Sequence, residues 1–295
     1  MSANIAPANP RAHIDPARQG TVYLVGAGPG DPGLLTVRAA SLLASCDIVF
    51  HDHLVNEAVL AVVARSAVRV DVGKIGHGPS ADQSGINMSL VAAARAGLRV
   101  VRLKGGDPYL FGRGAEEALA LVQAGVPFEV VPGVSALSAV PARAGIPLTH
   151  RGLATSVGVI AGACAGDGRL PEAVSGAAQA DTVVAFMALA NLDGLVRTLV
   201  AAGRATDTPA AAIASGTTAT ESTVVSTLGG LAAAVHTAQL QAPVLVVVGG
   251  VVALREQLSA PPQPDSAIAD DAHEHPPADR GRQQDRAKIL QECMN

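Results

Sequence analysis

The stretch Val101–Gly114 limits the possible folds more than any other part of this chain. It begins with an apolar run of the kind that fills a buried strand, and the run stops at Gly-Gly-Asp-Pro, where a helix cannot continue. Paired glycines alone are typical of an ordinary tight turn. Here they stand beside Asp107, a stiffening proline and two cations, and a helical pattern follows over Ala115–Ala124. This combination predicts a ligand-binding loop between a strand and a helix.

The same order of elements recurs along the first half of the chain. An apolar strand over Val22–Val25 ends in the glycine-rich loop Gly26–Gly33, and a helical spacing of apolar residues follows. A strand over Pro127–Val131 closes at Pro-Gly, and Ser135 is a natural N-cap for the next helix. Hydrophobic residues make up 49% of the chain but aromatic residues only 2%, so the core must be aliphatic, which favours helices packed on parallel strands. Further strands are expected at Ile48–Phe50 and Arg69–Val72, with helices over Val55–Ala64 and Ile86–Ala96.

The second half of the chain has many apolar runs but fewer helical patterns between them. Strands are expected at Val157–Ile160, Val183–Met187, Ala210–Ala214, Thr223–Ser226 and Val244–Val248, with helices over Asn191–Ala202 and Leu228–Thr237. We therefore expect a mixed sheet in this half. The predicted fold class is α/β, with two α/β domains at residues 21–133 and 134–260. A leader at 1–20 and a tail at 261–295 are expected to be disordered, because they cannot bury enough apolar surface.

Composition excludes several classes of protein. The formal net charge is −4 and there is no basic block, so nucleic acid is not an expected partner. The three cysteines lie far apart, which argues against a disulfide framework and a structural zinc site and suggests a reducing compartment. The longest apolar run, Val244–Leu254, is too short to span a bilayer. A cytoplasmic protein that does not enter the membrane is expected.

The first glycine-rich loop does not match the common nucleotide-binding patterns. In a dinucleotide fingerprint a third glycine would occupy the position of Asp31. A phosphate-binding P-loop fails as well, because Gly33 is followed by two leucines in place of Lys and Ser or Thr. This loop therefore binds another kind of ligand or shapes a cleft.

Polar residues follow two further strands. His51, Asp52 and His53 come at the end of one strand, but no further ligands lie nearby, so a metal site is not expected. Asp52 stands where α/β sheets place catalytic groups, yet it is equally well placed to cap a helix. Lys74 follows the next strand, and from its position alone a solvated side chain is the simpler interpretation. The His-Glu-His sequence at 273–275 in the tail is interpreted as solvated too.

Three motifs together resemble the uroporphyrinogen-III C-methyltransferases of the tetrapyrrole methylase family. They are Val22–Thr36, Val100–Gly114 and Gly145–Arg151, and the resemblance extends over about Thr21–Leu258. The chain departs from sequences usual in the family at residues 51–55, 83–87, 161–163 and 186–188. Some members carry an additional dehydrogenase and ferrochelatase module, and the short leader here leads us to expect none.

The resemblance implies that S-adenosyl-methionine donates methyl groups to C2 and C7 of uroporphyrinogen III, giving precorrin-2 for siroheme or cobalamin synthesis. It also implies a homodimer of chains with two α/β domains and a cofactor cleft between them, and no metal. The alternatives are a methyltransferase acting on a later precorrin and a non-catalytic S-adenosyl-methionine-binding module. The failed dinucleotide fingerprint argues against a nicotinamide-dependent oxidoreductase.

The resemblance also assigns roles to residues. Asp52 matches a proton acceptor and Lys74 a proton donor, which raises both above their simpler interpretations. The positions that match cofactor-binding residues are Pro29, Gly105, Gly106, Asp107, Leu110, Ser135, Ala136, Met187 and Gly216. Because the implied substrate carries eight carboxylates, cations are expected to line its site. The candidate cations are Arg38, Arg102, Lys104, Arg113, Arg143, His150 and Arg151.

Overall fold

The computed structural model describes residues 16–73, 83–162, 170 and 172–259. The chain divides into two compact units, and the first, residues 1–259, contains both sheets of the fold. The tail expected to be disordered, residues 261–295, lies outside the described residues. No helix among the described residues is both long and apolar enough to cross a bilayer.

The first sheet is entirely parallel and has the strand order β3-β2-β4-β1-β5. Its strands are β1 (Val22–Gly26), β2 (Ile48–His51), β3 (Val68–Asp71), β4 (Val100–Lys104) and β5 (Phe128–Val131). The helices that follow these strands are η2 (Pro32–Leu34), α1 (Val37–Leu43), α2 (Glu57–Leu60), α3 (Gln83–Arg95) and α4 (Gly114–Gln123). Parallel strands need a crossover connection, and these helices provide it.

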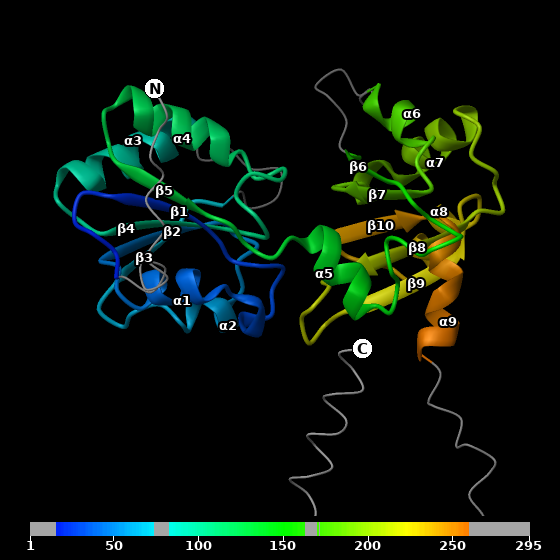
Figure 1. Cartoon of the computed structure of the whole chain (residues 1–295), viewed down its shortest axis with the longest axis horizontal. Coiled ribbons are helices and arrows are strands. Elements are labelled where there is room, and N and C mark those ends of the chain that lie inside the picture. The colour runs from blue at the N-terminus through cyan, green and yellow to red at the C-terminus, as the bar shows by residue number, and fades with distance from the viewer. Residues whose placement is uncertain (1–15, 74–82, 163–169, 171, 260–295) are drawn as a thin grey trace, which may run out of the picture. The chain divides into compact units, whose positions relative to one another are not determined.

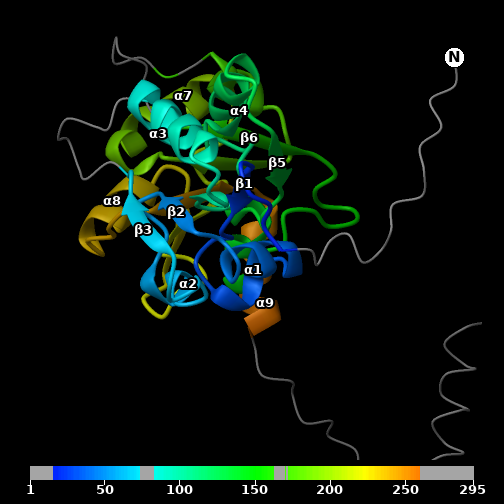
Figure 2. The same cartoon turned by 90° about the vertical axis from the view of Figure 1, so that its left-hand side faces the viewer.

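Helices cover both faces of this sheet. Successive side chains of a strand point to opposite faces, so Tyr23 and Val25 of β1 pack with α1 and α2, while Val22 and Leu24 pack with α3 and α4. Figures 1 and 2 show the two helix pairs on opposite sides of the strands. Every residue of β1 and β4 is buried as a result. Burial on both faces explains the apolar character of β1, whereas β4 carries two charged residues, Arg102 and Lys104, at buried positions.

The second sheet is mixed, with the order β6-β7-β10-β8-β9. Its strands are β6 (Val157–Ala161), β7 (Thr182–Phe186), β8 (Pro209–Ala214), β9 (Ser222–Thr227) and β10 (Val244–Val248). Only β6 and β7 are parallel, whereas β10 pairs antiparallel with β7 and β8, and β8 pairs antiparallel with β9. The mixed sheet predicted from the scarcity of helices is confirmed.

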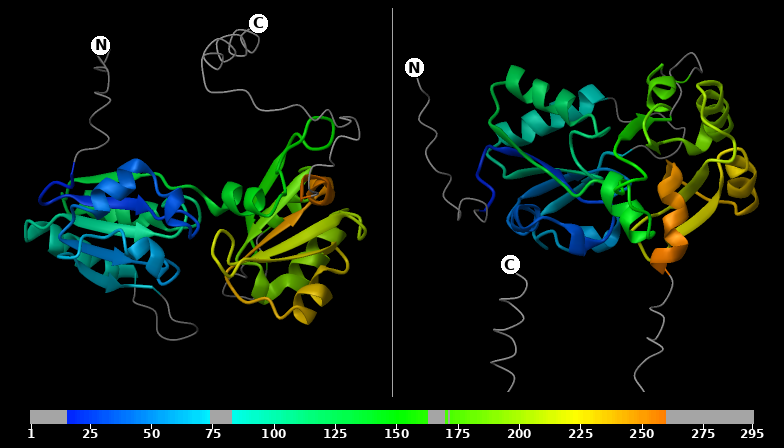
Figure 3. Two further views of the ribbon diagram at one scale, coloured as in Figure 1. Left: turned by 90° about the horizontal axis from the view of Figure 1, so that it is seen from below. Right: turned by 45° about the vertical axis from the view of Figure 1, so that its right-hand side comes forward.

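Helices also pack on both faces of the second sheet (Figure 3). They are α5 (Ala136–Arg143), α6 (Ala173–Ala177), η3 (Leu189–Asn191), α7 (Leu192–Ala201), α8 (Leu231–Thr237), η4 (Gly250–Ala253) and α9 (Leu254–Ser259). Residues of α6, α7 and α8 share a core with one face, and residues of α5 and η4 share a core with the other. The helix α5 therefore packs with the strands that come after it in the chain.

Local differences from the expected elements have identifiable causes. The expected helix over 55–64 is shortened to α2, which ends at Leu60; its start is set by Asn56, whose side chain accepts from the Val59 amide at 3.0 Å. The described part of the expected leader is not detached from the core. Ala17 is buried in the first sheet's core, and its amide donates to Ser45 Oγ at 2.9 Å. Packed structure thus begins before Thr21.

Candidate active site

The loops after β1, β4 and β5 meet at the carboxyl edge of the first sheet. Gly28 and Gly106 exchange two backbone hydrogen bonds, of 3.2 and 2.8 Å. A Cβ atom on Gly133 would lie 2.2 Å from the Gly106 carbonyl oxygen, and one on Gly26 would lie 2.4 Å from the Gly133 Cα. Only glycine fits where backbones approach so closely. The glycines of three separate motifs therefore form one continuous backbone surface.

Gly105 is different from these glycines. Its φ is not in the left-handed region, and the nearest neighbour that a Cβ atom there would find among the described residues is Leu54 Cβ, at 3.9 Å. The residue is exposed, so neither packing within the protein nor backbone conformation explains the missing side chain. A bare, accessible stretch of backbone is what a ligand lying against the loop requires. The observation fits the cofactor-binding role predicted for Gly105.

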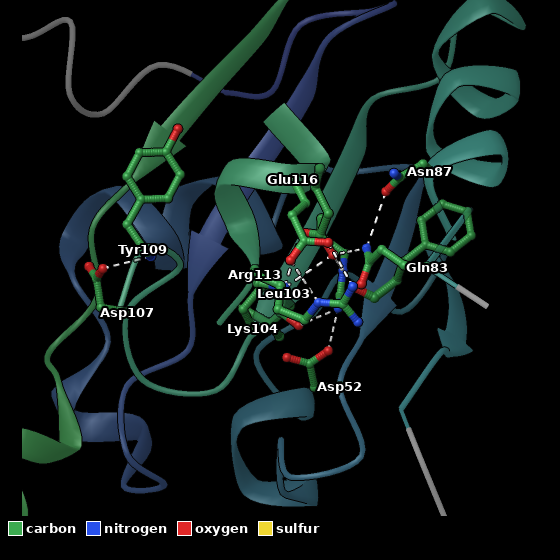
Figure 4. A network of polar contacts seen from close by, with 12 residues as sticks. Asp52, Gln83, Asn87, Leu103, Lys104, Asp107, Tyr109, Arg113 and Glu116 are labelled. Carbon is green, nitrogen blue, oxygen red and sulfur yellow. Dashed lines mark hydrogen bonds and ion pairs between the residues drawn. The ribbon is translucent and has the colours of Figure 1, made fainter. Parts of the chain in front are cut away.

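Asp107 holds this loop to the next one. Its Oδ1 accepts from the Tyr109 amide at 2.9 Å and its Oδ2 accepts from the Gly133 amide at 3.0 Å (Figure 4). The neighbouring Leu110 is partly buried, and its amide is 3.4 Å from the Asp107 carbonyl oxygen. The sequence predicted an acceptor that fixes a ligand, and the structure shows that its first partners are backbone amides.

The loop that carries Pro29 is anchored by hydrogen bonds at two consecutive residues, Gly30 and Asp31. Asn56 Nδ2 donates to the Gly30 carbonyl oxygen at 2.8 Å. The Asp31 amide donates to Thr217 Oγ1 at 3.3 Å, which joins this loop to the turn that follows β8. Neither Asn56 nor Thr217 was singled out from the sequence, because their partners are far away along the chain.

Gly216 precedes Thr217 and packs against the second sheet's helix α5. A Cβ atom on Gly216 would lie 2.4 Å from Val140 Cγ1, so the turn can approach α5 only without a side chain. Ser135 caps α5 through its hydroxyl, as expected. The Ala136 amide nitrogen at the start of the helix lies 3.9 Å from the Cβ position of Gly106. The predicted positions after β4, β5 and β8 are thus brought together.

Phe111 and Phe186 form the remaining link between predicted positions. Their ring centroids are 5.1 Å apart. Phe111 directly follows Leu110, and Phe186 directly precedes Met187, which is half-exposed. Met187 and Phe111 both have positive φ, of 54° and 56°. Non-glycine residues held in this conformation are rare and cluster at ligand sites.

Asp52 lies directly after β2 at the same edge of the first sheet. Its amide donates to the Leu103 carbonyl oxygen at 3.1 Å, and its Oδ1 accepts from Arg102 Nη2. Its Oδ2 has no hydrogen-bond partner among the described residues. The helix-cap interpretation of Asp52 is wrong, because Asn56 caps α2. Lys74 lies outside the described residues, so its predicted role stays a prediction.

A buried ionic cluster adjoins Asp52 (Figure 4). Arg102 and Lys104 are only 3% and 2% exposed. Arg102 Nε is 2.9 Å from Glu117 Oε1, and Lys104 Nζ is 3.0 Å from Glu117 Oε2. Burial lowers the pKa of Lys104, and the charge of Arg102 lowers it further. The expectation that Arg102 and Lys104 line a substrate site is wrong, because both side chains are enclosed and paired.

The other candidate cations fall into two groups. Arg38 pairs with Glu129 at 2.7 Å and Arg113 with Glu116 at 2.6 Å. The remaining candidates have exposed side chains and make no ion pair within the described part of the chain; they are Arg143, His150 and Arg151. These three remain the better candidates for binding a polyanionic ligand.

Glu117 was missed at the sequence level, although a signal was present. It lies on α4 three residues after the buried Gly114 and four before the buried Leu121. An acid on the core-facing side of a helix is unusual unless it is paired. The two cations of β4 were the partners to look for.

Neither histidine beside Asp52 joins a metal site in the described structure. His51 is buried, with Nδ1 3.2 Å from the Asp52 carbonyl oxygen, and His53 Nδ1 is 3.3 Å from Asp71 Oδ2. Among the described residues, no group of three or more potential ligands is arranged to hold a metal ion.

Comparison with known proteins extends over both sheets. Residues 21–232 match the tetrapyrrole (corrin/porphyrin) methylases. The chain is 47% identical over 245 residues to the siroheme synthase of Acinetobacter baylyi, which covers 82% of this chain and 53% of that protein. The chain thus spans about half the length of the curated relatives it matches.

Solved structures agree with this match. The crystal structure of uroporphyrin-III C-methyl transferase from Thermus thermophilus, complexed with S-adenyl homocysteine, has a TM-score of 0.70 and 40% identity, covering 79% of this chain and 99% of that one. A cobalt precorrin-4 methyltransferase has a TM-score of 0.70 and 26% identity, covering 84% and 99%. The arrangement of two α/β sheets, the convergent glycine loops and these matches together show that the chain belongs to the tetrapyrrole methylase family.

Proposed function

We propose that this protein transfers methyl groups from S-adenosyl-methionine to C2 and C7 of uroporphyrinogen III and so forms precorrin-2. The observation that carries the proposal is that the chain covers 99% of the Thermus thermophilus methyltransferase at 40% identity. The candidate residues described here also gather at the carboxyl edge of a parallel sheet, where α/β proteins bind ligands.

S-adenosyl-methionine would supply an electrophilic methyl group on a sulfonium ion. The bare backbone of Gly105, beside Leu54, fits a ligand that lies flat against the loop. Asp107 keeps that loop in place by binding two backbone amides, and the contact of Phe111 with Phe186 brings Leu110 and Met187 near each other. The residues proposed to hold the cofactor between the two halves are Pro29, Gly105, Gly106, Asp107, Leu110, Ser135, Ala136, Met187 and Gly216.

Asp52 is proposed to accept the proton that the methylated pyrrole carbon must lose. A carboxylate is suited to this task when one oxygen is held and the other is available. Arg102 holds Oδ1, and Oδ2 has no partner among the described residues. Lys74 remains the proposed proton donor. Arg143, His150 and Arg151 are proposed to bind substrate carboxylates, because their charges are not paired with acids of the described chain.

The test is incubation with labelled S-adenosyl-methionine and uroporphyrinogen III, followed by mass analysis. Two added methyl groups are expected. The similarity to a cobalt precorrin-4 methyltransferase keeps a later precorrin as the second candidate substrate. Methylation of a later precorrin alone would establish that alternative. Cofactor binding without methylation of any of these tetrapyrroles would instead establish a non-catalytic module.

We further propose two α/β domains that divide near residue 133, because α5 shares its core with the second sheet. The family resemblance supports a homodimer, and the widely spaced cysteines support a cytoplasmic location. Sedimentation equilibrium tests the oligomeric state, with twice the chain mass of 29.5 kDa expected.

A further inference from the structure

Two cations lie side by side beneath the proposed site. Arg102 and Lys104 are two residues apart on β4, so their side chains point to the same face of the sheet. Both are almost completely withdrawn from water. Burying two neighbouring positive charges is unfavourable unless an anion compensates for them.

Glu117 supplies that anion from the helix α4, which packs on the first sheet. Its side chain is fully buried, and its single carboxylate binds Arg102 Nε at 2.9 Å and Lys104 Nζ at 3.0 Å. Gln83 Nε2 at the start of α3 lies 3.4 Å from Glu117 Oε1. The next residue of α4, Ala118, packs in the core of the first sheet, so the helix itself holds Glu117 in place.

The Arg102 guanidinium connects Glu117 to Asp52. Its Nε donates to Glu117, its Nη1 donates to the Leu103 carbonyl oxygen at 3.1 Å, and its Nη2 donates to Asp52 Oδ1. A guanidinium is planar, with its donors in a fixed fork. The bond of Nε to Glu117, together with the Nη1 bonds to the carbonyl oxygens of Leu103 and of Phe50, at 3.4 Å, therefore sets the direction in which Nη2 meets Asp52.

We propose that Glu117 is a positioning residue: through Arg102 it fixes the orientation of the Asp52 carboxylate. Glu117 has no exposed surface and touches no reacting group, so it acts only through its neighbour. The inference rests on the proposed function in one respect, namely that Asp52 is the proton acceptor. The geometric part of the inference, that Glu117 places Asp52, stands independently of any activity.

The kinetic test compares Glu117→Gln with Glu116→Gln. Glu116 is the adjacent acid of α4, and its pair with Arg113 is exposed, so it serves as a matched control. Glu117→Gln is expected to lower kcat about a hundredfold, the effect of a misplaced reacting group, with little change in KM or in cofactor affinity. Glu116→Gln is expected to retain wild-type kcat. Wild-type kcat in folded Glu117→Gln would overturn the proposal.

A double-mutant cycle separates positioning from general stability. If Glu117 acts through Asp52, Glu117→Gln lowers kcat much less in an Asp52→Asn background than in the wild type. A purely structural role would lower kcat by the same factor in both backgrounds and would refute the proposal. If Glu117→Gln does not fold, Arg102→Lys takes its place, because one ammonium cannot bridge Glu117 and Asp52 as a fork does.

Crystal structures of the wild type and of the same variant decide the geometric claim without activity. The ion pair of Arg102 with Asp52 is expected to be lost or reoriented in Glu117→Gln. An unchanged pair would overturn the inference even if the wild type methylates uroporphyrinogen III. A wild type that methylates no tetrapyrrole would overturn the proposed function, while the structural comparison would still decide the role of Glu117.

Discussion

At the scale of single residues, the site depends on which side chains are missing as much as on which are present. Gly133 is glycine because backbones touch there, whereas Gly105 is glycine although the protein leaves room for a side chain. Asp52 and Asp107 look alike in sequence, each following a strand. In the structure Asp107 binds two backbone amides, and Asp52 binds one buried guanidinium.

Asp52→Asn is expected to lower kcat by about 10² to 10⁴ and to leave the affinity for S-adenosyl-methionine unchanged, because an amide cannot accept the proton. Single-turnover kinetics and calorimetry measure the two quantities. Asp193→Asn, at an exposed position on α7, is the matched control and should behave as the wild type. Equal turnover in Asp52→Asn and the wild type would contradict the assignment.

Gly105→Ala is expected to weaken S-adenosyl-methionine binding while leaving the melting temperature within about a degree or two, because within the described part of the chain its Cβ would meet only Leu54, at 3.9 Å. Gly133→Ala is expected to act mainly on stability. It should lower the melting temperature, because its Cβ would lie 2.2 Å from the Gly106 carbonyl oxygen. Calorimetric titration and thermal unfolding of both variants check this. Wild-type affinity in Gly105→Ala would argue against a ligand at that backbone.

At the scale of elements, the loops at the strand ends are held by carboxylates that accept from backbone amides. Asp107 joins the loop after β4 to the loop after β5. Asp181, which directly precedes β7, joins the start of β7 to the start of β6. Its Oδ2 accepts from the amides of Thr155 and Ser156 at 2.7 and 3.0 Å. Such hydrogen bonds fix neighbouring strands relative to each other, and they lie outside the strands' own ladders.

Asp107→Ala is expected to weaken S-adenosyl-methionine binding about tenfold or more, because the Tyr109 and Gly133 amides lose their acceptor and the loops separate. Asp107→Asn keeps one acceptor oxygen and should fall between the wild type and the alanine variant. Isothermal titration calorimetry measures all three affinities. An unchanged affinity in Asp107→Ala would refute this role.

Acid should weaken the junction of β6 and β7. The Thr155 amide, and then the Thr155 hydroxyl and the Ser156 hydroxyl and amide, lower the pKa of Asp181 from 3.8 to about 2. The folded-state pKa lies below the unfolded one, so the stabilisation is complete above about pH 4 and is lost as the pH falls towards 2. Urea unfolding of the wild type and Asp181→Asn should show a difference in free energy at pH 6 that disappears near pH 2. A difference independent of pH would contradict the assignment.

At the scale of the whole molecule, each sheet builds two cores of its own, one on each face. The two halves are joined at the loops by the contacts of Asp31 with Thr217 and of Phe111 with Phe186. The cofactor candidates lie in these same loops, and both sheets belong to the unit of residues 1–259.

A chain ending at Ser259 is expected to unfold at the same temperature as the full chain, because the described core clusters lie between Ala17 and Val252. Calorimetry of the two chains provides the comparison. A chain ending at Val248 is the control and should be less stable, because it lacks Val251 and Val252 of the second sheet's core. A lower midpoint for the chain ending at Ser259 would show that residues 260–295 stabilise the fold.

The sequence predicted much of the fold correctly, because the dominant signals are local. Runs rich in apolar or β-branched residues, most of them followed by glycine, proline or polar residues, indicated the ten strands of the two described sheets within a residue or two. Local patterns predicted helix ends less well: Asn56 caps α2, which begins at Glu57, and from the sequence Asp52 was an equally plausible cap. Asp52 and Asn56 both have side chains that can cap a helix. Which of them does so depends on the conformation of the turn between them, which the local sequence pattern does not specify.

By itself, the sequence determined the α/β class, the mixed second sheet and the glycine loops, since these follow from spacing along the chain. Only the tertiary structure decided what the charged residues do. Arg102 and Lys104 were expected at a substrate surface, and they are instead buried because α4 places Glu117 against them. Burial and ion pairing depend on side chains that are distant in sequence, and packing alone brings them together.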